Sequence, residues 1–450
     1  MAIRETAQTR QTRRTLQEGL RLGERLRQLR VAAGLTQSDL AGDRFSKEYL
    51  SQIERGKTRP THETIEWLAA RLGVDSGFLA NGVATDDRAK LEGALARAEA
   101  LYQANRNDEA IAAFEPLVAS ARATGVPELE VRALVGTGLA KMRLGAHREA
   151  LDLLNEARAL TETEPFSDVE RADVLLRLAG CRYQLNSVQT ALALFNEALA
   201  LADRSGLPCD ALKSNILSWR SRCWRRQRDY EAAREDVERA LELAQGVDDP
   251  WTIGAAYFQA SLIADRDGRW VLARNYAEKA REAYTEIADQ AHVGQLTNNL
   301  GGLNFLLGKT DEAVDLLKEA FRIAIDNGLE ADAGRAVSSL AQVHLRTGEL
   351  AQAEEQARHA LRLLEGREDY TDEVGNVHLV LGRALLEQNR LDDAEGEFRA
   401  AEESYASLGS ASHRAAVWVA RGDLAARRGD DRLAASLYRS AAEALQDVRF

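Results

Sequence analysis

The chain has 450 residues, of which 29% are charged and 45% hydrophobic, a composition typical of a folded protein. It holds no 18-residue apolar run and begins without the apolar core of a signal peptide, so we expect a cytoplasmic protein with no membrane partner. The net charge of −12 is uneven. Residues 1–81 hold 14 Lys and Arg against 10 Asp and Glu. The rest of the chain holds the other 45 of the 59 Lys and Arg and the other 61 of the 71 Asp and Glu. Only the N-terminal part is therefore expected to meet a polyanion.

Residues 1–20 carry four arginines among Thr and Gln, namely Arg4, Arg10, Arg13 and Arg14. Two interpretations remain open for this segment. It is either a disordered tail or a flexible basic arm that lies along DNA or enters its minor groove.

Five short helices are predicted between residues 21 and 80. Leu22, Leu26 and Leu29 mark the apolar face of the first, and Thr36 opens a capping box for the second. A tight turn leads to a third helix between Ser46 and Gly56, and apolar positions predict a fourth over 65–72 and a fifth over 74–79. Short helices with a tight turn between the second and third are typical of a helix-turn-helix domain.

The third helix carries the candidate chemistry of this domain. At about 100° per residue, Leu50 and Ile53 fall on one side and polar side chains on the other. These polar residues are Lys47, Glu48, Ser51, Gln52 and Arg55. Such a set can address base edges in a major groove, and the alternative is an ordinary solvated helix face.

Three segments resemble the Xre (lambda-repressor-like) DNA-binding domain: Leu35-Thr-Gln-Ser-Asp-Leu-Ala41, Tyr49-Leu-Ser-Gln-Ile-Glu-Arg-Gly-Lys-Thr-Arg-Pro60 and Leu68-Ala-Ala-Arg-Leu-Gly-Val74. The resemblance implies that Lys47, Glu48, Ser51 and Gln52, behind the N-cap Ser46, read bases. It also implies that Gln37, Arg55, Lys57 and Arg59 hold phosphates. The turn before the third helix is one residue short of the family pattern and lacks its usual glycine, which leaves the angle of that helix open. Because Glu48 opposes the phosphate field, we expect high affinity to need a homodimer.

A second pattern fills residues 88–450, after a linker over 81–87. An alanine recurs every 40–42 residues, at Ala110, Ala150, Ala191, Ala233, Ala273, Ala313, Ala353, Ala394 and Ala434. Relative to this first alanine, a large residue commonly lies four residues later and a second alanine seven residues later. A glycine commonly lies five residues before it and a small residue twelve residues before it. Small residues let two helices approach closely, so each unit is predicted to be a helical hairpin that needs its neighbour.

This unit resembles the tetratricopeptide repeat, lengthened from about 34 residues to about 40. HEAT-like repeats have a similar length, but the small-residue register favours tetratricopeptide. The fold class predicted is therefore all-α, a five-helix head followed by nine hairpins. The resemblance implies a right-handed superhelix whose concave wall is lined by the first helix of each hairpin.

One segment interrupts the acidic body: Trp219 to Arg228 holds five arginines and two tryptophans. These arginines either pair with neighbouring acidic helices or form an anion-binding patch on the concave wall. Inner-wall positions are expected 18, 15, 11 and 8 residues before each first alanine. In the fourth to seventh hairpins the candidate ligand-binding residues are Asn215, Ser218, Trp219, Arg222, Arg225, Phe258, Gln295, Asn298, Arg335, Ser338 and Gln342. Arginines, amides and aromatic rings together suit a peptide.

The chain contains no GxxxxGK[ST], HExxH or GxSxG motif and no CxxC pair, so we expect no enzyme, no cofactor and no metal site. The two-part architecture resembles the peptide-pheromone receptors of Gram-positive bacteria. That resemblance implies a transcriptional regulator that binds double-stranded DNA, whose repeat groove takes a short peptide and whose body dimerises. Two alternatives remain open: a DNA-tethered scaffold whose groove binds another protein, and a repressor whose body only dimerises.

Overall fold

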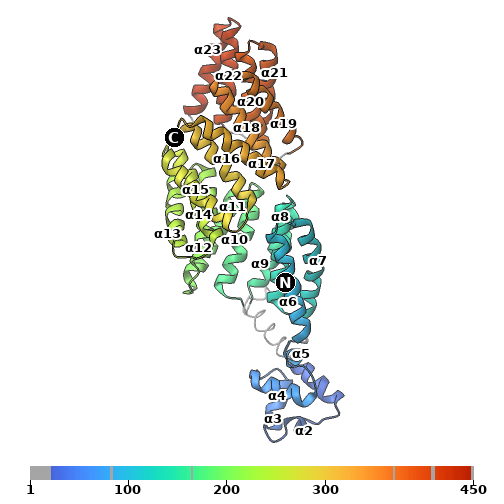
Figure 1. Ribbon diagram of the computed structural model, residues 1–450. Coiled ribbons are helices and arrows are strands. Elements are labelled where there is room, and N and C mark those ends of the chain that lie inside the picture. Colours follow the sequence, from blue (N-terminus) through green and yellow to red (C-terminus); the bar gives the residue numbers. More distant parts are fainter. Residues whose placement is uncertain (1–21, 82–84, 164–165, 368–369, 407–410, 447–450) are drawn as a thin grey trace, which may run out of the picture. The chain divides into compact units, whose positions relative to one another are not determined.

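The computed structural model describes residues 22–81, 85–163, 166–367, 370–406 and 411–446, and within these ranges the regular structure is helical throughout (Figure 1). The chain divides into two compact units, Met1–Leu212 and Lys213–Phe450. The predicted basic arm, residues 1–20, lies outside the described ranges. Within those ranges, every helix is too short or too polar to cross a lipid bilayer.

The N-terminal head contains the five predicted helices. They are residues 22–32, α2 (Gln37–Ala41), α3 (Lys47–Glu54), α4 (His62–Leu72) and α5 (Ser76–Asn81). Thr36 forms the predicted capping box with Asp39, and the Ser46 hydroxyl accepts a hydrogen bond from the backbone N–H of Tyr49 at 3.1 Å. Each cap satisfies a backbone donor that the first helical turn leaves unpaired, which fixes where the helix begins.

A small core holds these helices together. Leu26, Leu50 and Ile53 are at most 1% exposed and pack with Leu40 and Leu68. A glycine at position 23 lets the first helix approach α3 closely, because a Cβ there would lie 2.4 Å from the carbonyl oxygen of Ile53. The first helix therefore sets the position of α3 from behind.

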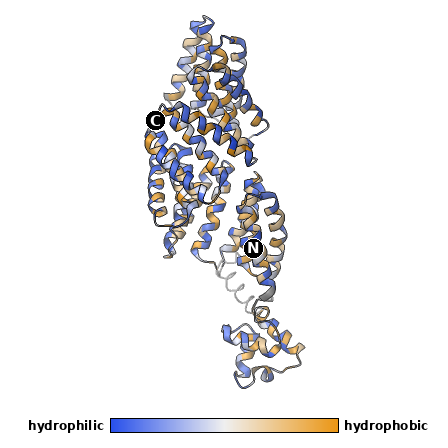
Figure 2. Cartoon of the chain, in the orientation of Figure 1, coloured by the Kyte–Doolittle hydropathy of each residue, from blue (hydrophilic) through white to orange (hydrophobic). Residues whose placement is uncertain are grey.

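The repeat region consists of eighteen helices in the described residues, paired as nine hairpins as predicted, and in the fourth hairpin the Arg220–Asp236 ion pair joins the two helices. The first helix begins at Thr85, inside the predicted linker. In chain order the helices are α6 (Thr85–Gln103), α7 (Asn107–Thr124), α8 (Pro127–Arg143), α9 (His147–Thr161), α10 (Asp168–Gln184), α11 (Val188–Arg204), α12 (Asp210–Gln227), α13 (Tyr230–Ala244), α14 (Pro250–Arg266), α15 (Trp270–Glu286), α16 (Gln290–Leu306), α17 (Thr310–Asp326), α18 (Glu330–Thr347), α19 (Leu350–Leu363), α20 (Thr371–Glu387), α21 (Leu391–Ala406), α22 (Ala411–Arg427) and α23 (Asp431–Gln446). Hydrophobic and hydrophilic positions alternate along these helices (Figure 2).

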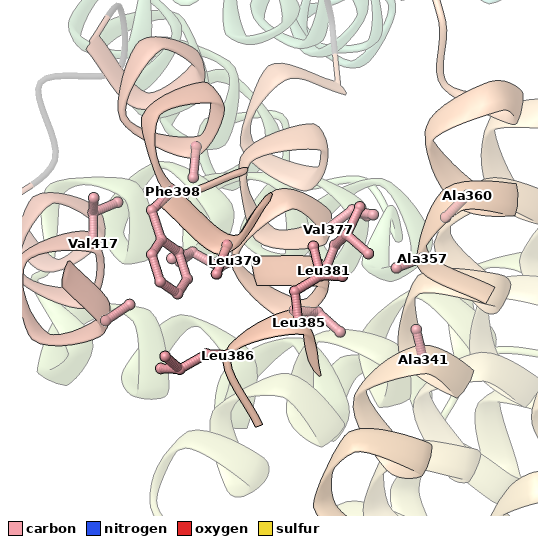
Figure 3. Packing of buried hydrophobic residues seen from close by; sticks show 14 of the residues in the cluster. Ala341, Ala357, Ala360, Val377, Leu379, Leu381, Leu385, Leu386, Phe398 and Val417 are labelled. Carbon is pink, nitrogen blue, oxygen red and sulfur yellow. The ribbon is translucent and has the colours of Figure 1, made fainter. Parts of the chain in front are cut away.

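Small residues sit where the two helices of a hairpin meet. Gly382 of α20 lies against the Phe398 ring of α21, so close that a Cβ at 382 would be 2.5 Å from the ring. Gly138 and Leu154 meet in the same register in the second hairpin. Figure 3 shows Phe398 among Leu379 and Leu386 of α20 and Val417 of α22, so the ring also reaches the next hairpin. This confirms the predicted pairing of the small residue with the large one.

Each hairpin turn contains one residue in the left-handed region, five positions before the first alanine. Glycine fills five of these turns, and the other four hold Asn105, Asn186, Arg228 and Asn389, with φ between 59° and 64°. Asparagine tolerates this conformation better than most residues. Arg228 is therefore the exception among the nine turns.

Candidate functional site

The outward face of α3 is exposed as the periodicity predicts. Lys47, Glu48 and Gln52 are exposed and Ser51 is half-buried, whereas Leu50 and Ile53 are buried. The phosphate candidates Arg55, Lys57 and Arg59 are also exposed, just beyond the end of α3. Helix α3 thus presents the side chains that are predicted to read bases, and the loop directly after it presents three of those predicted to contact phosphates.

A tight loop closes the C-terminus of α3. The Lys57 N–H donates to the Gln52 carbonyl oxygen at 2.8 Å, across Gly56, whose φ is 66°. This is the Schellman arrangement that the glycine predicts. The Thr58 hydroxyl then donates to Oε1 of the Gln52 side chain at 2.9 Å. The carboxamide on the exposed face is therefore oriented by the loop that follows it.

Glu54 anchors α3 on its buried side. Arg30 donates to both carboxylate oxygens, at 2.6 and 3.2 Å, and the Gln37 amide donates to Oε2 at 2.7 Å. The hydrogen bond that Arg30 donates to Glu54 raises the pKa of the Arg30 guanidinium above its usual value. Gln37 thus links the start of α2 to the end of α3, and the phosphate contact assigned to it stays a prediction.

The turn between α2 and α3 contains a glycine at its start, Gly42, and none directly before α3. Gly42 adopts φ 53°, and the Arg71 side chain of α4 lies against it and donates to the Asp39 carbonyl oxygen at 2.7 Å. Phe45 packs edge-on against Trp67 of α4 at 5.1 Å. The fourth helix therefore supports this shortened turn.

The arginines of the fourth hairpin divide into two roles. Arg220 forms an ion pair with the buried Asp236 at 2.5 Å, so the structural interpretation holds for this residue. The Arg222 guanidinium lies 4.3 Å from the centre of the Trp219 ring. With its carboxamide oxygen turned toward Arg222, Gln259 accepts from Nε and Nη2 at 3.1 Å each. The Trp219 ring of the same helix and the Gln259 amide of the next hairpin therefore both contact that guanidinium.

Neighbouring first helices are joined by polar contacts one helical turn before the predicted wall positions. Asn215 donates to Thr252 at 3.1 Å, and Ser338 donates to Glu373 at 2.5 Å. Gln295 Nε2 lies 3.5 Å from a carboxylate oxygen of Asp332 in the next first helix, and Arg335 lies 3.5 Å from the same carboxylate within that helix. The acceptors Thr252, Asp332 and Glu373 all lie 21 residues before the first alanine, as does His292, and none of them is among the predicted wall residues. Extending the wall register by one turn would have found them.

Several wall oxygens are buried without such a contact. Asn215 Oδ1, Ser218 Oγ and Asn298 Oδ1 accept no hydrogen bond from the described residues. Gly302, four residues after Asn298 on the same helix, has open space where a Cβ would lie. A glycine inside a helix costs about 1 kcal/mol relative to alanine. At position 302 no close helix contact requires glycine, so the missing side chain leaves space beside Asn298.

The remaining wall candidates differ in environment. Gln342 is exposed, while Phe258 is 8% exposed and packs edge-on against His292 at 6.4 Å. Arg225 is half-buried. Burial raises the pKa of the Glu373 carboxyl, and the Ser338 hydrogen bond and the Arg335 charge oppose this. The predicted wall thus combines a cationic fourth hairpin with acidic groups of the seventh and eighth.

A helix-turn-helix head with an exposed third helix, followed by packed helical hairpins, defines a DNA-binding type of protein with a repeat body. Comparison with known families agrees with this class. The helix-turn-helix domain matches residues 21–78, and tetratricopeptide repeats match residues 95–165, 252–326, 292–366 and 378–448. The chain belongs to the helix-turn-helix-type transcriptional regulators and carries a tetratricopeptide-repeat body.

Three similar proteins illustrate the two parts. The transcriptional regulator DdrOP3 of Deinococcus deserti is 45% identical over 65 residues, which are 14% of this chain and 50% of that protein. The uncharacterized regulator y4dJ of Sinorhizobium fredii is 44% identical over 54 residues, 12% of this chain and 70% of that one. The chain thus spans half the length of the first of these relatives. The quorum sensor NprR of B. thuringiensis, in its apo form, has a TM-score of 0.52 at 15% identity, covering 80% of this chain and 94% of that one.

Proposed function

We propose that this protein is a sequence-specific DNA-binding regulator whose repeat body binds a short peptide and thereby changes its affinity for DNA. The observation that carries the proposal is the exposed polar face of α3, set on a buried apolar face and closed by a basic loop. This is the arrangement that lets one helix enter a major groove while flanking cations contact the backbone.

The DNA-binding part is tested by separating base contacts from phosphate contacts. Gln52→Ala is expected to relax sequence preference at one or two base pairs, at a cost of about 1–3 kcal/mol. Arg55→Ala, as the matched control, is expected to weaken all sequences alike and to reduce the salt dependence of binding. Selection from randomised DNA, followed by salt titration of the selected site, measures both effects. An unchanged preference in Gln52→Ala contradicts the assignment of α3 as the reading helix.

The peptide-binding part rests on the inner face of the fourth to seventh hairpins. Buried acceptors at Asn215 and Asn298 suit ligand N–H groups, because a buried polar atom left unpaired costs about 1–3 kcal/mol. Arg222, whose guanidinium lies 4.3 Å from the centre of the Trp219 ring, suits a carboxylate, since hydrogen bonds between charged partners are stronger than those between neutral ones. The similar structure of NprR, described as a quorum sensor, agrees with a signal-binding body. A ligand that changes DNA affinity must in turn have its own affinity changed by DNA.

Two peptide pools that differ only at the C-terminus test this site. A synthetic pool of short peptides with free carboxylates is expected to yield bound species by native mass spectrometry, and the same pool with amidated ends to yield few. Peptides recovered this way should shift DNA affinity in the native protein but not in Arg222→Ala/Arg225→Ala. Circular dichroism and basal DNA affinity serve as controls for folding. Equal capture of both pools contradicts the carboxylate contact, and capture of neither contradicts peptide binding.

We also propose that the body forms a homodimer through its C-terminal hairpins. The last described helix, α23, leaves Leu433 49% and Leu445 44% exposed. Exposed leucines on one helix suit a contact with a second copy of the chain. A second copy would bring two heads to two half-sites about one helical turn apart. Sedimentation at micromolar concentration, with and without DNA, is expected to show a dimer, and a monomer in both conditions contradicts this.

A further inference from the structure

The Gln52 side chain is held by a residue outside the recognition helix. Thr58 is half-buried in the loop after α3, and its hydroxyl lies 2.9 Å from Gln52 Oε1. The loop itself is closed independently of that hydroxyl, by the Lys57 N–H bond to the Gln52 carbonyl and by the left-handed Gly56. The hydroxyl therefore acts on the carboxamide and not on the course of the backbone.

A carboxamide has two kinds of recognition atom, an oxygen that accepts and a nitrogen that donates twice. Reading adenine uses both, because its major-groove edge offers the N7 acceptor and the N6 amino donor. Guanine offers only acceptors, N7 and O6, and thymine offers the O4 acceptor, whereas cytosine offers a donor. A carboxamide whose oxygen faces the loop presents its N–H groups outward and so matches an edge made of acceptors.

We propose that Thr58 is a specificity-determining positioning residue, which fixes the Gln52 carboxamide so that its N–H groups face the DNA and select guanine or thymine. The inference rests on the proposed DNA-binding function. It adds that base choice at the Gln52 position is decided jointly by α3 and the loop behind it. Because Thr58 acts through Gln52, removing its hydroxyl should change which base is preferred and leave the contacts from Arg55 and Lys57 unaffected.

The test compares four full-length proteins in selection from randomised DNA: wild type, Thr58→Val, Thr58→Ser and Gln52→Ala. Valine matches threonine in shape and lacks the hydroxyl, whereas serine keeps it. Wild type and Thr58→Ser are expected to enrich guanine or thymine at one position by about tenfold or more. Gln52→Ala is expected to lose that preference, and Thr58→Val to shift it toward adenine. The salt dependence of binding should stay the same in Thr58→Val.

Several outcomes would overturn the inference. Thr58→Val could keep the wild-type preference at every position, wild type could select adenine at the position that Gln52→Ala relaxes, or Gln52→Ala could keep all preferences. A general loss of affinity in Thr58→Val, with its base preferences unchanged, would likewise assign Thr58 a purely structural role. A wild-type protein that enriches no sequence contradicts the proposed function itself, which separates that failure from failure of the Thr58 assignment. Thermal melting of each variant establishes that the compared proteins are folded.

Discussion

The close approach of the two helices in the eighth hairpin can be tested by placing a methyl group at two glycines. A Cβ at Gly382 would lie 2.5 Å from Phe398 Cε1 and 2.6 Å from its Cδ1. The Phe398 ring would have to retreat by about 1 Å to restore ordinary contact, and it is 0% exposed. Gly396, in the facing helix of the same hairpin, has nothing within 4 Å of its Cβ position. The pair therefore isolates packing from helix propensity.

The two substitutions gain the same propensity, since glycine costs about 1 kcal/mol relative to alanine inside a helix. Gly396→Ala is accordingly expected to stabilise the hairpin by about 0.5–1 kcal/mol. Gly382→Ala carries in addition the cost of overpacking a filled core, about 1–3 kcal/mol. The difference between the variants, about 1–3 kcal/mol in the free energy of local opening, is then the overpacking cost alone.

Hydrogen exchange of amides in α20 and α21 is the suitable measurement. Repeat arrays open locally rather than as one two-state unit, so a global melting curve would mix the contributions of all hairpins. Equal protection in Gly382→Ala and Gly396→Ala would refute the close contact between α20 and the Phe398 ring. A lower protection confined to Gly382→Ala and to the α20–α21 pair would support it.

Three further predictions follow from single residues. Arg228→Gly should raise the protection of the amides of α12 and α13 by about 0.5–1 kcal/mol, because a left-handed turn strains arginine and not glycine, and an unchanged value would argue against that strain. Since burial raises the pKa of Glu373 in the folded state, its ionisation opposes folding, and stability should fall as the pH rises through and above the usual carboxyl range; Glu373→Gln should remove that slope in denaturation measured at several pH values. Burial raises the pKa of Cys181 to about 11 and of Cys223 to about 12, so a thiol-alkylating reagent near neutral pH should modify neither until the chain is unfolded, and rapid modification of the native protein would contradict their burial.

Most of the fold could be predicted because the chain repeats itself. Turns with glycine five residues before the first alanine were visible in the sequence, and the Gly382–Phe398 pair followed from the same register. The second glycine register was missed: Gly254 faces Tyr284 and Gly375 faces Tyr405, each nineteen residues before and eleven after the first alanine. The spacing of these residues in the sequence does not show that they are in contact, because that depends on which parts of the two helices lie side by side in the folded hairpin.

The candidate site was predicted less fully than the fold. Helical periodicity placed Gln52 on the exposed face of α3 and Leu50 and Ile53 on its buried face. It could not show that Thr58 holds the Gln52 side chain or that Glu54 joins Arg30 to Gln37, because these bonds connect different elements. In the body, a dense arginine cluster marks the fourth hairpin as the candidate site. Which guanidinium is already paired, as Arg220 is with Asp236, depends on the neighbouring helix.

The left-handed turns have a consequence for how such a body changes over evolutionary time. They recur with nearly constant spacing and the packing pairs keep a fixed offset from them, as the small residues at 138 and 382 show. Recombination between two copies of the turn would therefore delete or duplicate one whole hairpin and leave matching surfaces on either side of the junction. The length of the repeat body could then change in steps of one hairpin, while a point mutation at a position such as 222 or 298 would change the surface chemistry without changing the length.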